Sequence, residues 1–541
     1  MRLGVWGIFG IWGFFAVWVL FAGAGCFLPG VQPEPGSPAA RAEARAARPG
    51  PEPDAVVSLN ALGEKALAQG DLETARGRFE RALEMHPSSL DALYGMARVA
   101  RRSGDAERAR AWLGEVVVAD PEHYDALVEL CALLAEGGER EAALAAGTRA
   151  RAVAFGRPEA HALLSDLTGR APPLPSPAPG SSVEERVAAA VERAGEHPYD
   201  PTATLAAARA LIEAGRPDEA ARWLRGSWWM ADLEPSAGLE SVALLAEVDE
   251  DWSSRRVVPV YTFADDDIRA DSFWRMRMRF VWADLTEALA PLLDTVFVPV
   301  AIQPFSSAGR DSRIASIRRS VGWGASLSGP PGIVAIFTER PPPDRRGTWR
   351  MGEATFLGRH LTVRLDPSPT TATTTLVHEV LHLYGGVHVS PEYPSIMNPR
   401  GGEMQLDQPN TRIAHLTRDR RFDGRGVERD VLARVDEEAL AKAFRAALAL
   451  NLQARQAGML EAETSMGESR YLAARQARRA GALDEHLGDV SSLMAQLVLR
   501  QGLRAEAVRY FDLASHLYGP KSARGVQARS RADALLARPL P

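Results

Sequence analysis

The chain has 541 residues, of which 46% are hydrophobic and 24% charged, and its formal net charge is -6. A chain of this length is too long to fold around one compact hydrophobic core, so we expect several domains. The nearly neutral charge balance argues against the strongly basic surface of a nucleic-acid-binding protein. With only two cysteines, Cys26 and Cys131, the chain can build neither a disulfide framework nor cysteine-based zinc ligation.

The N-terminal segment 1–28 is apolar and carries no charge after Arg2. It is longer than an ordinary secretory signal core and long enough for a spanning helix of about 20 residues. Its end, Ala24-Gly25-Cys26, resembles that of a bacterial lipoprotein signal, although Gly23 replaces the usual Leu. Four alternatives stay open: lipidation at Cys26, an uncleaved membrane anchor, simple cleavage, or a wrongly assigned start codon. The first two predict a body anchored by its N-terminus on the extracytoplasmic side of a bacterial cell envelope.

A pattern with a period of 34 residues follows from residue 56. Small and apolar residues recur at matching places, for example Gly70 with Gly104 and Phe79 with Leu113. A third copy keeps Gly138 and Ala143 and then loses the pattern. Period and composition resemble the tetratricopeptide repeat, which implies antiparallel helix pairs and a surface for protein partners.

The rest of the chain divides by composition and periodicity. Residues 257–264, 295–302, 332–339, 349–356 and 360–366 have strand patterns, and 270–291 reads as an amphipathic helix. Together with a helix after residue 366, they predict one α+β domain with a mixed sheet. The expected segments are a tether (29–55), repeats (56–170), a linker (171–183), repeat-like helices (184–250), the α+β domain (255–426) and a helical C-terminal region (427–541).

The stretch HEVLHLYGGVH, residues 378–388, points to metal chemistry. Histidines four residues apart on a helix face the same way, so His378 and His382 fit one zinc ion. Glu379 lies about 100° around the helix axis, where it can act on a water as general base. A left-handed Gly385 would end the helix and let His388 supply a third ligand, leaving one position open for catalysis.

The complete HExxHxxGxxH pattern, followed by Met397 in "YPSIMNP", resembles the metzincin clan of zinc endopeptidases, and within it the matrixin branch. The resemblance covers about 255–425. It implies a zincin-like catalytic domain with one zinc ion on His378, His382 and His388, Glu379 as general base, Gly385 ending the helix, and Met397 beneath the metal. It also implies a protein or peptide substrate that pairs with an edge strand near 349–356.

Some features depart from this pattern or have simpler explanations. Pro399 stands where astacin-like members carry a Tyr, Val389 follows the third histidine, and the reach of Tyr393 stays open. The acidic run 263–271 suggests calcium, but a strand-end turn explains it more simply. His360 and His415 have no partner at ligand spacing and read as surface residues.

Two functions therefore compete. In the first, the chain is an envelope-tethered zinc endopeptidase whose repeats dock partners or substrates. In the second, it is a tetratricopeptide scaffold or adaptor of the envelope with a degenerate or secondary zinc domain. Neither function involves nucleic acid.

Overall fold

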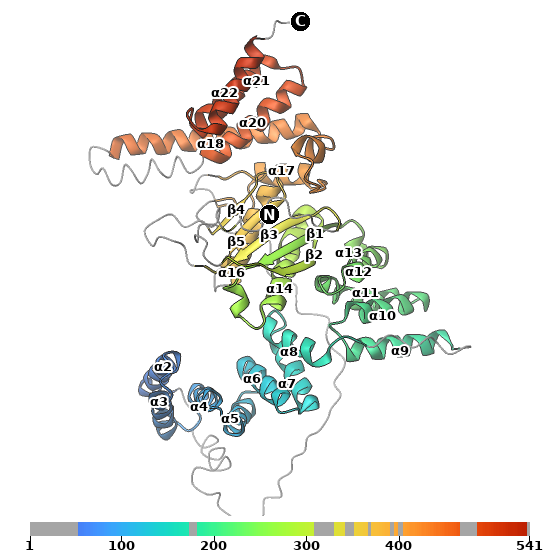
Figure 1. Ribbon diagram of the computed structural model, residues 1–541, viewed down its shortest axis with the longest axis vertical. Coiled ribbons are helices and arrows are strands. Elements are labelled where there is room, and N and C mark those ends of the chain that lie inside the picture. Colours follow the sequence, from blue (N-terminus) through green and yellow to red (C-terminus); the bar gives the residue numbers. More distant parts are fainter. Residues whose placement is uncertain are drawn as a thin grey trace, which may run out of the picture. The chain divides into compact units, whose positions relative to one another are not determined.

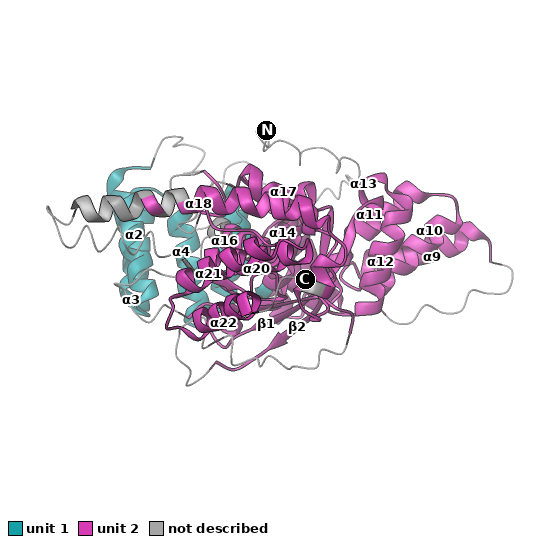
Figure 2. Ribbon diagram, turned by 90° about the horizontal axis from the view of Figure 1, so that it is seen from above, with its two compact units in different colours: residues 1–133 teal, residues 134–541 magenta. Residues whose placement is uncertain are grey.

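The computed structural model describes residues 52–171, 181–307, 317, 329–340, 351–365, 369–389, 394–398, 404–465 and 484–537. The expected leader 1–28, Cys26, nearly all of the tether, Tyr393 and Pro399 lie outside the described residues. No helix in the described ranges has both the length and the apolar character needed to cross a membrane. The chain forms two compact units, residues 1–133 and 134–541 (Figure 2).

The first unit consists of helices that pair in sequence order. We call its first four helices the repeat segment: α2 (Asp54–Ala68), α3 (Leu72–Met85), α4 (Leu90–Arg102) and α5 (Ala106–Ala119). Gly70 and Gly104 each turn the chain between paired helices with a φ of 79°, which L side chains rarely adopt. Asp71 and Asp105 then cap the next helix by accepting hydrogen bonds from Thr74 N and Arg108 N, at 3.1 Å each.

Further helical hairpins lead from the end of the first unit to the sheet. Their bounds are α6 (Tyr124–Glu136), α7 (Arg140–Val153), α8 (Pro158–Thr168), α9 (Val183–Glu196), α10 (Pro201–Glu213), α11 (Pro217–Arg225), η1 (Trp228–Met230), α12 (Pro235–Val248) and α13 (Glu250–Ser253). The turn glycine recurs at Gly138 and Gly215, with φ of 78° and 72°. Helical repeat-like structure therefore extends beyond the three copies visible in the sequence.

A small mixed sheet follows (Figure 1). Its strands are β1 (Arg256–Ala264), β2 (Thr295–Pro304), β3 (Ile333–Thr338), β4 (Gly352–Ala354) and β5 (His360–Arg364), in the order β2-β1-β3-β5-β4. All neighbours pair parallel except β4, which is antiparallel to β5 with Gly352 opposite Val363. β4 therefore forms one edge of the sheet, and it is shorter than the expected 349–356.

Helices cover both faces of this sheet. The turn η2 (Ile268–Ala270) leads into α14 (Trp274–Leu293), and α16 spans Pro369–Leu383. Phe297 and Phe337 point into a core with Trp282 of α14 and Leu376 of α16. The alternate strand residues, such as Val298 and Ile336, enter a second core with side chains of α10–α12. This two-faced burial explains why the strands read as almost continuous apolar runs.

The C-terminal helices share a core with the end of the sheet domain. Their bounds are α17 (Gln408–Thr417), the π-helical turn η3 (Glu428–Leu432), α18 (Glu437–Ser465), α20 (Asp484–Arg500), α21 (Arg504–Tyr518) and α22 (Ala523–Ala537). Val387 and Ile413 pack in one cluster with Phe444 of α18 and with Leu487 and Val490 of α20. Because this core includes Val387, the residue before His388, the C-terminal helices pack against the segment 378–388.

Candidate metal centre

The helix α16 ends where the sequence predicts. Gly385 has a φ of 87°, donates a hydrogen bond to His382 O at 3.0 Å, and is followed by a bond from Gly386 N to Leu381 O at 2.8 Å. This pair of bonds is the Schellman arrangement that closes helices with a left-handed glycine. It turns the chain back, so that residues 387–389 pass beside the last turn of the helix.

The structure brings the three predicted histidines together. The Nε2 atoms of His378, His382 and His388 lie 3.0 to 3.1 Å from one another. They form a cluster with metal-ligand spacing within the described residues. Three nitrogens placed tetrahedrally about 2.0–2.1 Å from one zinc ion stand about 3.3 Å apart. The three side chains therefore fit a single zinc ion.

Hydrogen bonds to backbone carbonyls orient two of these rings. His378 Nδ1 lies 2.6 Å from Ile396 O, and His382 Nδ1 lies 2.7 Å from Gly386 O. A carbonyl can only accept, so each Nδ1 carries the proton and each Nε2 presents its lone pair to the cluster. Burial lowers the pKa of His378, and burial together with His486 and His378 holds the pKa of His382 well below its usual range. Both effects favour the neutral imidazole that a metal requires.

The side chain of Glu379 lies against the edge strand β4. Its side chain is buried, and a Cβ atom added to Gly352 of β4 would overlap its carboxylate. The absence of a side chain at Gly352 is thus what lets the carboxylate sit against the backbone of β4. Glu379, which belongs to the same helix α16 as His378 and His382, therefore packs against the backbone of the edge strand.

Met397 is fully buried and lies behind the turn of the motif. Val389 N donates to Met397 O at 3.2 Å, and a Cβ on Gly386 would lie 3.1 Å from Met397 Cε. Asn410 of α17 holds the other side of the same segment, accepting from Val387 N at 2.7 Å and donating to Val387 O at 2.9 Å. Sequence reasoning missed Asn410, because nothing in its spacing from the motif marks it.

A buried ion pair caps the C-terminal end of α16. Arg420 donates to the carbonyls of Leu383 and Leu357 and pairs with Asp430 at 2.7 Å, with both charged side chains 3% exposed. Thr417 Oγ1 donates to Tyr384 O at 2.6 Å. A cation at this end of a helix also complements the helix dipole. These contacts fix the end of the helix from which His382 projects.

A fourth histidine, His486 of α20, contacts the cluster. Its ring is stacked on His382, with centroids 4.5 Å apart and planes 9° apart, and meets His388 edge to face at 4.2 Å. No sequence pattern pointed to His486, which lies far from the motif along the chain. Only the folded C-terminal helices bring it there.

The remaining candidate residues lie apart from the cluster. His360 belongs to β5 and His415 is exposed on α17. In the acidic run, Asp265 accepts hydrogen bonds from Thr338 and Ser307, and Asp266 from Ser306, which is the behaviour of a strand-end turn. Cys131 is buried and takes part in no disulfide.

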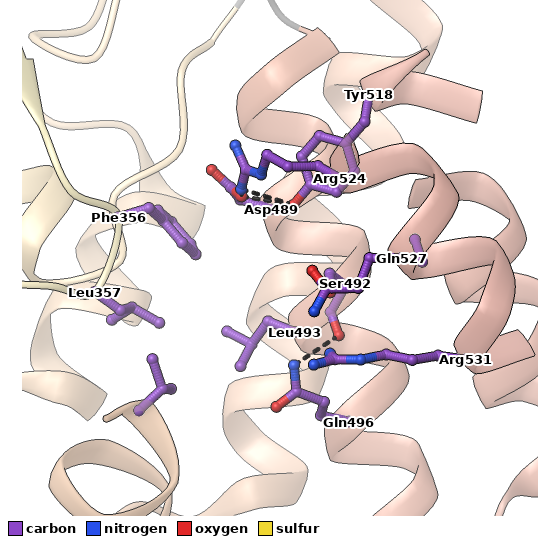
Figure 3. A pocket seen from close by; sticks show the side chains of 12 residues that line it. Phe356, Leu357, Asp489, Ser492, Leu493, Gln496, Tyr518, Arg524, Gln527 and Arg531 are labelled. Atoms are coloured by element: carbon purple, nitrogen blue, oxygen red, sulfur yellow. Dashed lines mark hydrogen bonds and ion pairs between the residues drawn. The ribbon is translucent and has the colours of Figure 1, made fainter. Parts of the chain in front are cut away.

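A cavity of about 230 Å³ lies between the turn after β4 and helices α20–α22 (Figure 3). Phe356 and Leu357 line one side of it, and Asp489, which accepts a 2.6 Å hydrogen bond from Tyr518, lies on the other. The three histidines of the cluster are not among its lining residues. We therefore treat it as separate from the metal centre.

Comparison with known proteins identifies the repeats. A family model described as tetratricopeptide repeat matches residues 60–123. No curated relative matches the chain. Among solved structures, the chain is similar to MamA from Desulfovibrio magneticus RS-1, at 18% identity over 34% of this chain and 98% of that one, with a TM-score of 0.21.

Two further solved structures are similar at the same level. TTC0263, a thermophilic tetratricopeptide protein of Thermus thermophilus, is 21% identical over 35% of this chain and 99% of its own, with a TM-score of 0.20. YrrB, described as a tetratricopeptide protein with an unusual peptide-binding site, is 17% identical over 38% and 98%, with a TM-score of 0.21. The tetratricopeptide prediction is thus confirmed for residues 60–123, whereas the comparisons give no support to the metzincin resemblance.

Proposed function

We propose that the chain is a zinc-dependent peptidase that also docks protein partners through its helical repeats. The main support for the peptidase proposal is the close approach of three histidine Nε2 atoms, which lie 3.0 to 3.1 Å from one another, and the presence of Glu379 on the same helix as two of these histidines. Three neutral histidines leave one zinc position open, which distinguishes catalytic from structural sites.

When bound, zinc supplies a Lewis acid that polarises the scissile carbonyl and acidifies a water molecule. His378, His382 and His388 would hold the ion with their Nε2 atoms. Glu379 accepts the proton of the attacking water and returns it to the departing amine. Burial of Glu379 and His382 strengthens the electrostatic contacts that these two side chains make.

The edge strand β4 offers a place for an extended substrate. Among the described residues its outer side has no neighbour in the sheet order, and its residue Gly352 lies against Glu379. A peptide that added to β4 as a further strand would run past the carboxylate that takes the proton. We therefore assign an extended polypeptide as the substrate class.

The test compares full-length wild type, Glu379→Ala and His415→Ala, with zinc content and cleavage of a peptide library measured on the same samples. We expect Glu379→Ala to keep one zinc ion per chain and to cleave about 10²–10⁴-fold more slowly, the usual contribution of a general base. His415→Ala, which removes an exposed histidine, should match wild type. A zinc-loaded Glu379→Ala protein that cleaves at the wild-type rate would refute the mechanism.

The second candidate is a scaffold in which the zinc domain is secondary. The family match to residues 60–123 favours it, since tetratricopeptide repeats generally mediate binding of protein partners. The comparisons support this function better than the peptidase. Full-length Glu379→Ala that loses cleavage but sustains the wild-type phenotype in cells would make docking the main role.

The N-terminal segment 1–28 is the basis for a proposal about where in the cell the protein acts. We propose that it exports the body and tethers it at Cys26 to the outer side of a membrane, on the lipoprotein-like sequence Ala24-Gly25-Cys26. Metabolic labelling with a fatty acid tests this. Label on wild type but not on Cys26→Ser supports lipidation, and an unlabelled wild-type chain excludes it.

A further inference from the structure

The helix α20 places a histidine ring against the metal centre from the C-terminal side. His486 stacks on His382 with ring centroids 4.5 Å apart, and its ring meets His388 at 4.2 Å with an angle of 66° between the planes. One side chain thus contacts two of the three proposed ligands. This contact takes no part in the proposed peptide hydrolysis.

The position of His486 is set by packing. The next residue, Leu487, lies in the core cluster that also holds Val387, the residue before His388. A Cβ at Gly488 would lie 2.6 Å from the ring of Tyr518, so α20 and α21 approach closely at this point. His486 is therefore carried by a helix that is anchored to the same core as the third ligand.

The three ligands differ in how firmly the backbone holds them. His378 and His382 project from the regular helix α16, whereas His388 follows the glycine turn and belongs to no helix or strand. An imidazole binds a metal only when its in-plane lone pair points at the ion, so the orientation of each ring plane matters. His486 contacts the ligand that comes from the irregular segment and one that comes from the helix.

We propose that His486 is a positioning residue of the metal centre, whose ring fixes the planes of His382 and His388. The inference rests on the proposed zinc function. It assigns α20 to the metal centre as a structural part, in addition to any docking role of the C-terminal helices.

The stacked geometry argues against His486 as a fourth ligand. Two imidazole rings with centroids 4.5 Å apart and planes 9° apart cannot be coplanar without overlapping, so their planes are offset. The lone pair of His382 Nε2 points along the plane of its own ring, whereas the nitrogen lone pairs of His486 point along the offset plane of the His486 ring. A metal held by His382 would therefore not be reached by a lone pair of His486.

The experiment measures zinc affinity by competition with a chromophoric chelator, on the full-length chain as wild type, His486→Ala and His486→Phe. Phenylalanine keeps a flat ring for stacking but has no nitrogen. We expect His486→Ala to weaken zinc binding about 10–100-fold, as loss of a residue that orients ligands usually does. His486→Phe should stay close to wild type.

Two further readouts separate positioning from general destabilisation. The visible spectrum of the cobalt(II)-substituted protein reports ligand geometry, and we expect it to change in His486→Ala and to be preserved in His486→Phe. The thermal midpoint of the metal-free proteins shows whether either variant is simply less stable, with His415→Ala as the matched histidine control.

The outcomes are distinct. Unchanged zinc affinity and cobalt spectrum in His486→Ala would overturn the positioning role while leaving the peptidase proposal intact. An equal loss in His486→Phe and His486→Ala would also overturn it, because the nitrogen rather than the ring would then be required. A wild-type chain that binds no zinc would instead overturn the proposed function, on which this inference rests.

Discussion

The repeat segment and the metal centre are stabilised by contacts of different range. In the repeat segment, Phe79 of α3 lies between the preceding helix and the following one, against Gly63 and Gly95. The metal centre instead combines the helix α16, the strand β4, the segment around Arg420 and the distant helix α20. A substitution in one repeat should therefore affect only the neighbouring helices, whereas the metal centre depends on parts of the chain that are far apart in sequence.

The largest expected effect is at the buried ion pair behind α16. Asp430→Asn removes the charge that compensates Arg420, and both side chains are almost inaccessible to solvent. An uncompensated buried charge typically costs about 3–5 kcal/mol, so we expect the free energy of unfolding of the second unit to fall by that amount. Zinc affinity should fall with it, because Arg420 also holds the carbonyl of Leu383.

Urea unfolding of the full chain, followed by a probe in each unit, measures this effect. The control is Asp512→Asn, which breaks an exposed pair with Arg529 and should change stability by about 0–1 kcal/mol. Equal effects of the two substitutions would show that the C-terminal end of α16 does not depend on the buried pair.

The repeat segment offers the opposite test. Gly95→Ala adds a methyl group that overlaps the ring of Phe79, so we expect a loss of about 1–3 kcal/mol in the stability of the first unit. The matched control Gly77→Ala faces open space in α3 and should stabilise by about 0.5–1 kcal/mol. Zinc affinity should not change in either variant.

Replacing the Phe79 ring by a smaller side chain should reverse the effect of Gly95→Ala. In the double variant Phe79→Leu with Gly95→Ala, the added methyl group has room, so the double-mutant cycle should show a favourable coupling. Additive losses would mean that the close contact between Gly95 and Phe79 does not determine the spacing of α3 and α4. A change in zinc affinity would contradict the local character of the repeat.

The same difference in range decides what could be predicted from the sequence. The residue periodicity of a strand or a repeat depends on neighbouring residues alone, and the expected strands accordingly lie close to β1, β2, β3 and β5. The spacing of His378, His382 and His388 likewise describes one turn of helix followed by a glycine turn. Asn410 and His486 reach the motif only through tertiary packing, and no spacing in the sequence encodes it. The shortened β4 pairs with β5 through Gly352, Glu353 and Ala354 in the part of the chain that the structure describes.

His161 tests the junction between the repeat-like helices and the sheet domain. It is buried in α8 beside Phe280 of α14, where its Nε2 donates to Phe155 O at 2.8 Å and its Nδ1 accepts from Tyr199 OH at 2.8 Å. Burial lowers the pKa of His161 to about 4, while the Phe155 carbonyl acts in the opposite direction. The unfolded chain, with an ordinary histidine pKa of about 6.5, therefore binds the proton more readily than the folded chain does.

The sign of the pH effect follows from this difference. Since the unfolded state takes up more protons below pH 6.5, this residue lowers the stability of the folded state as the pH falls from about 6.5 towards 4. This effect of His161 amounts to about 1 kcal/mol of folding stability between pH 6.5 and 5.5.

In His161→Phe, the stability at neutral pH should drop because Tyr199 OH and Phe155 O lose their partner, but the slope of stability against pH should be shallower by that amount. Free energies of unfolding at several pH values measure the slope, and His415→Ala, which removes an exposed histidine, should keep the wild-type slope. Parallel slopes for wild type and His161→Phe would mean that the junction opens before the rest of the second unit, and that its helices behave like the repeats rather than like the sheet domain.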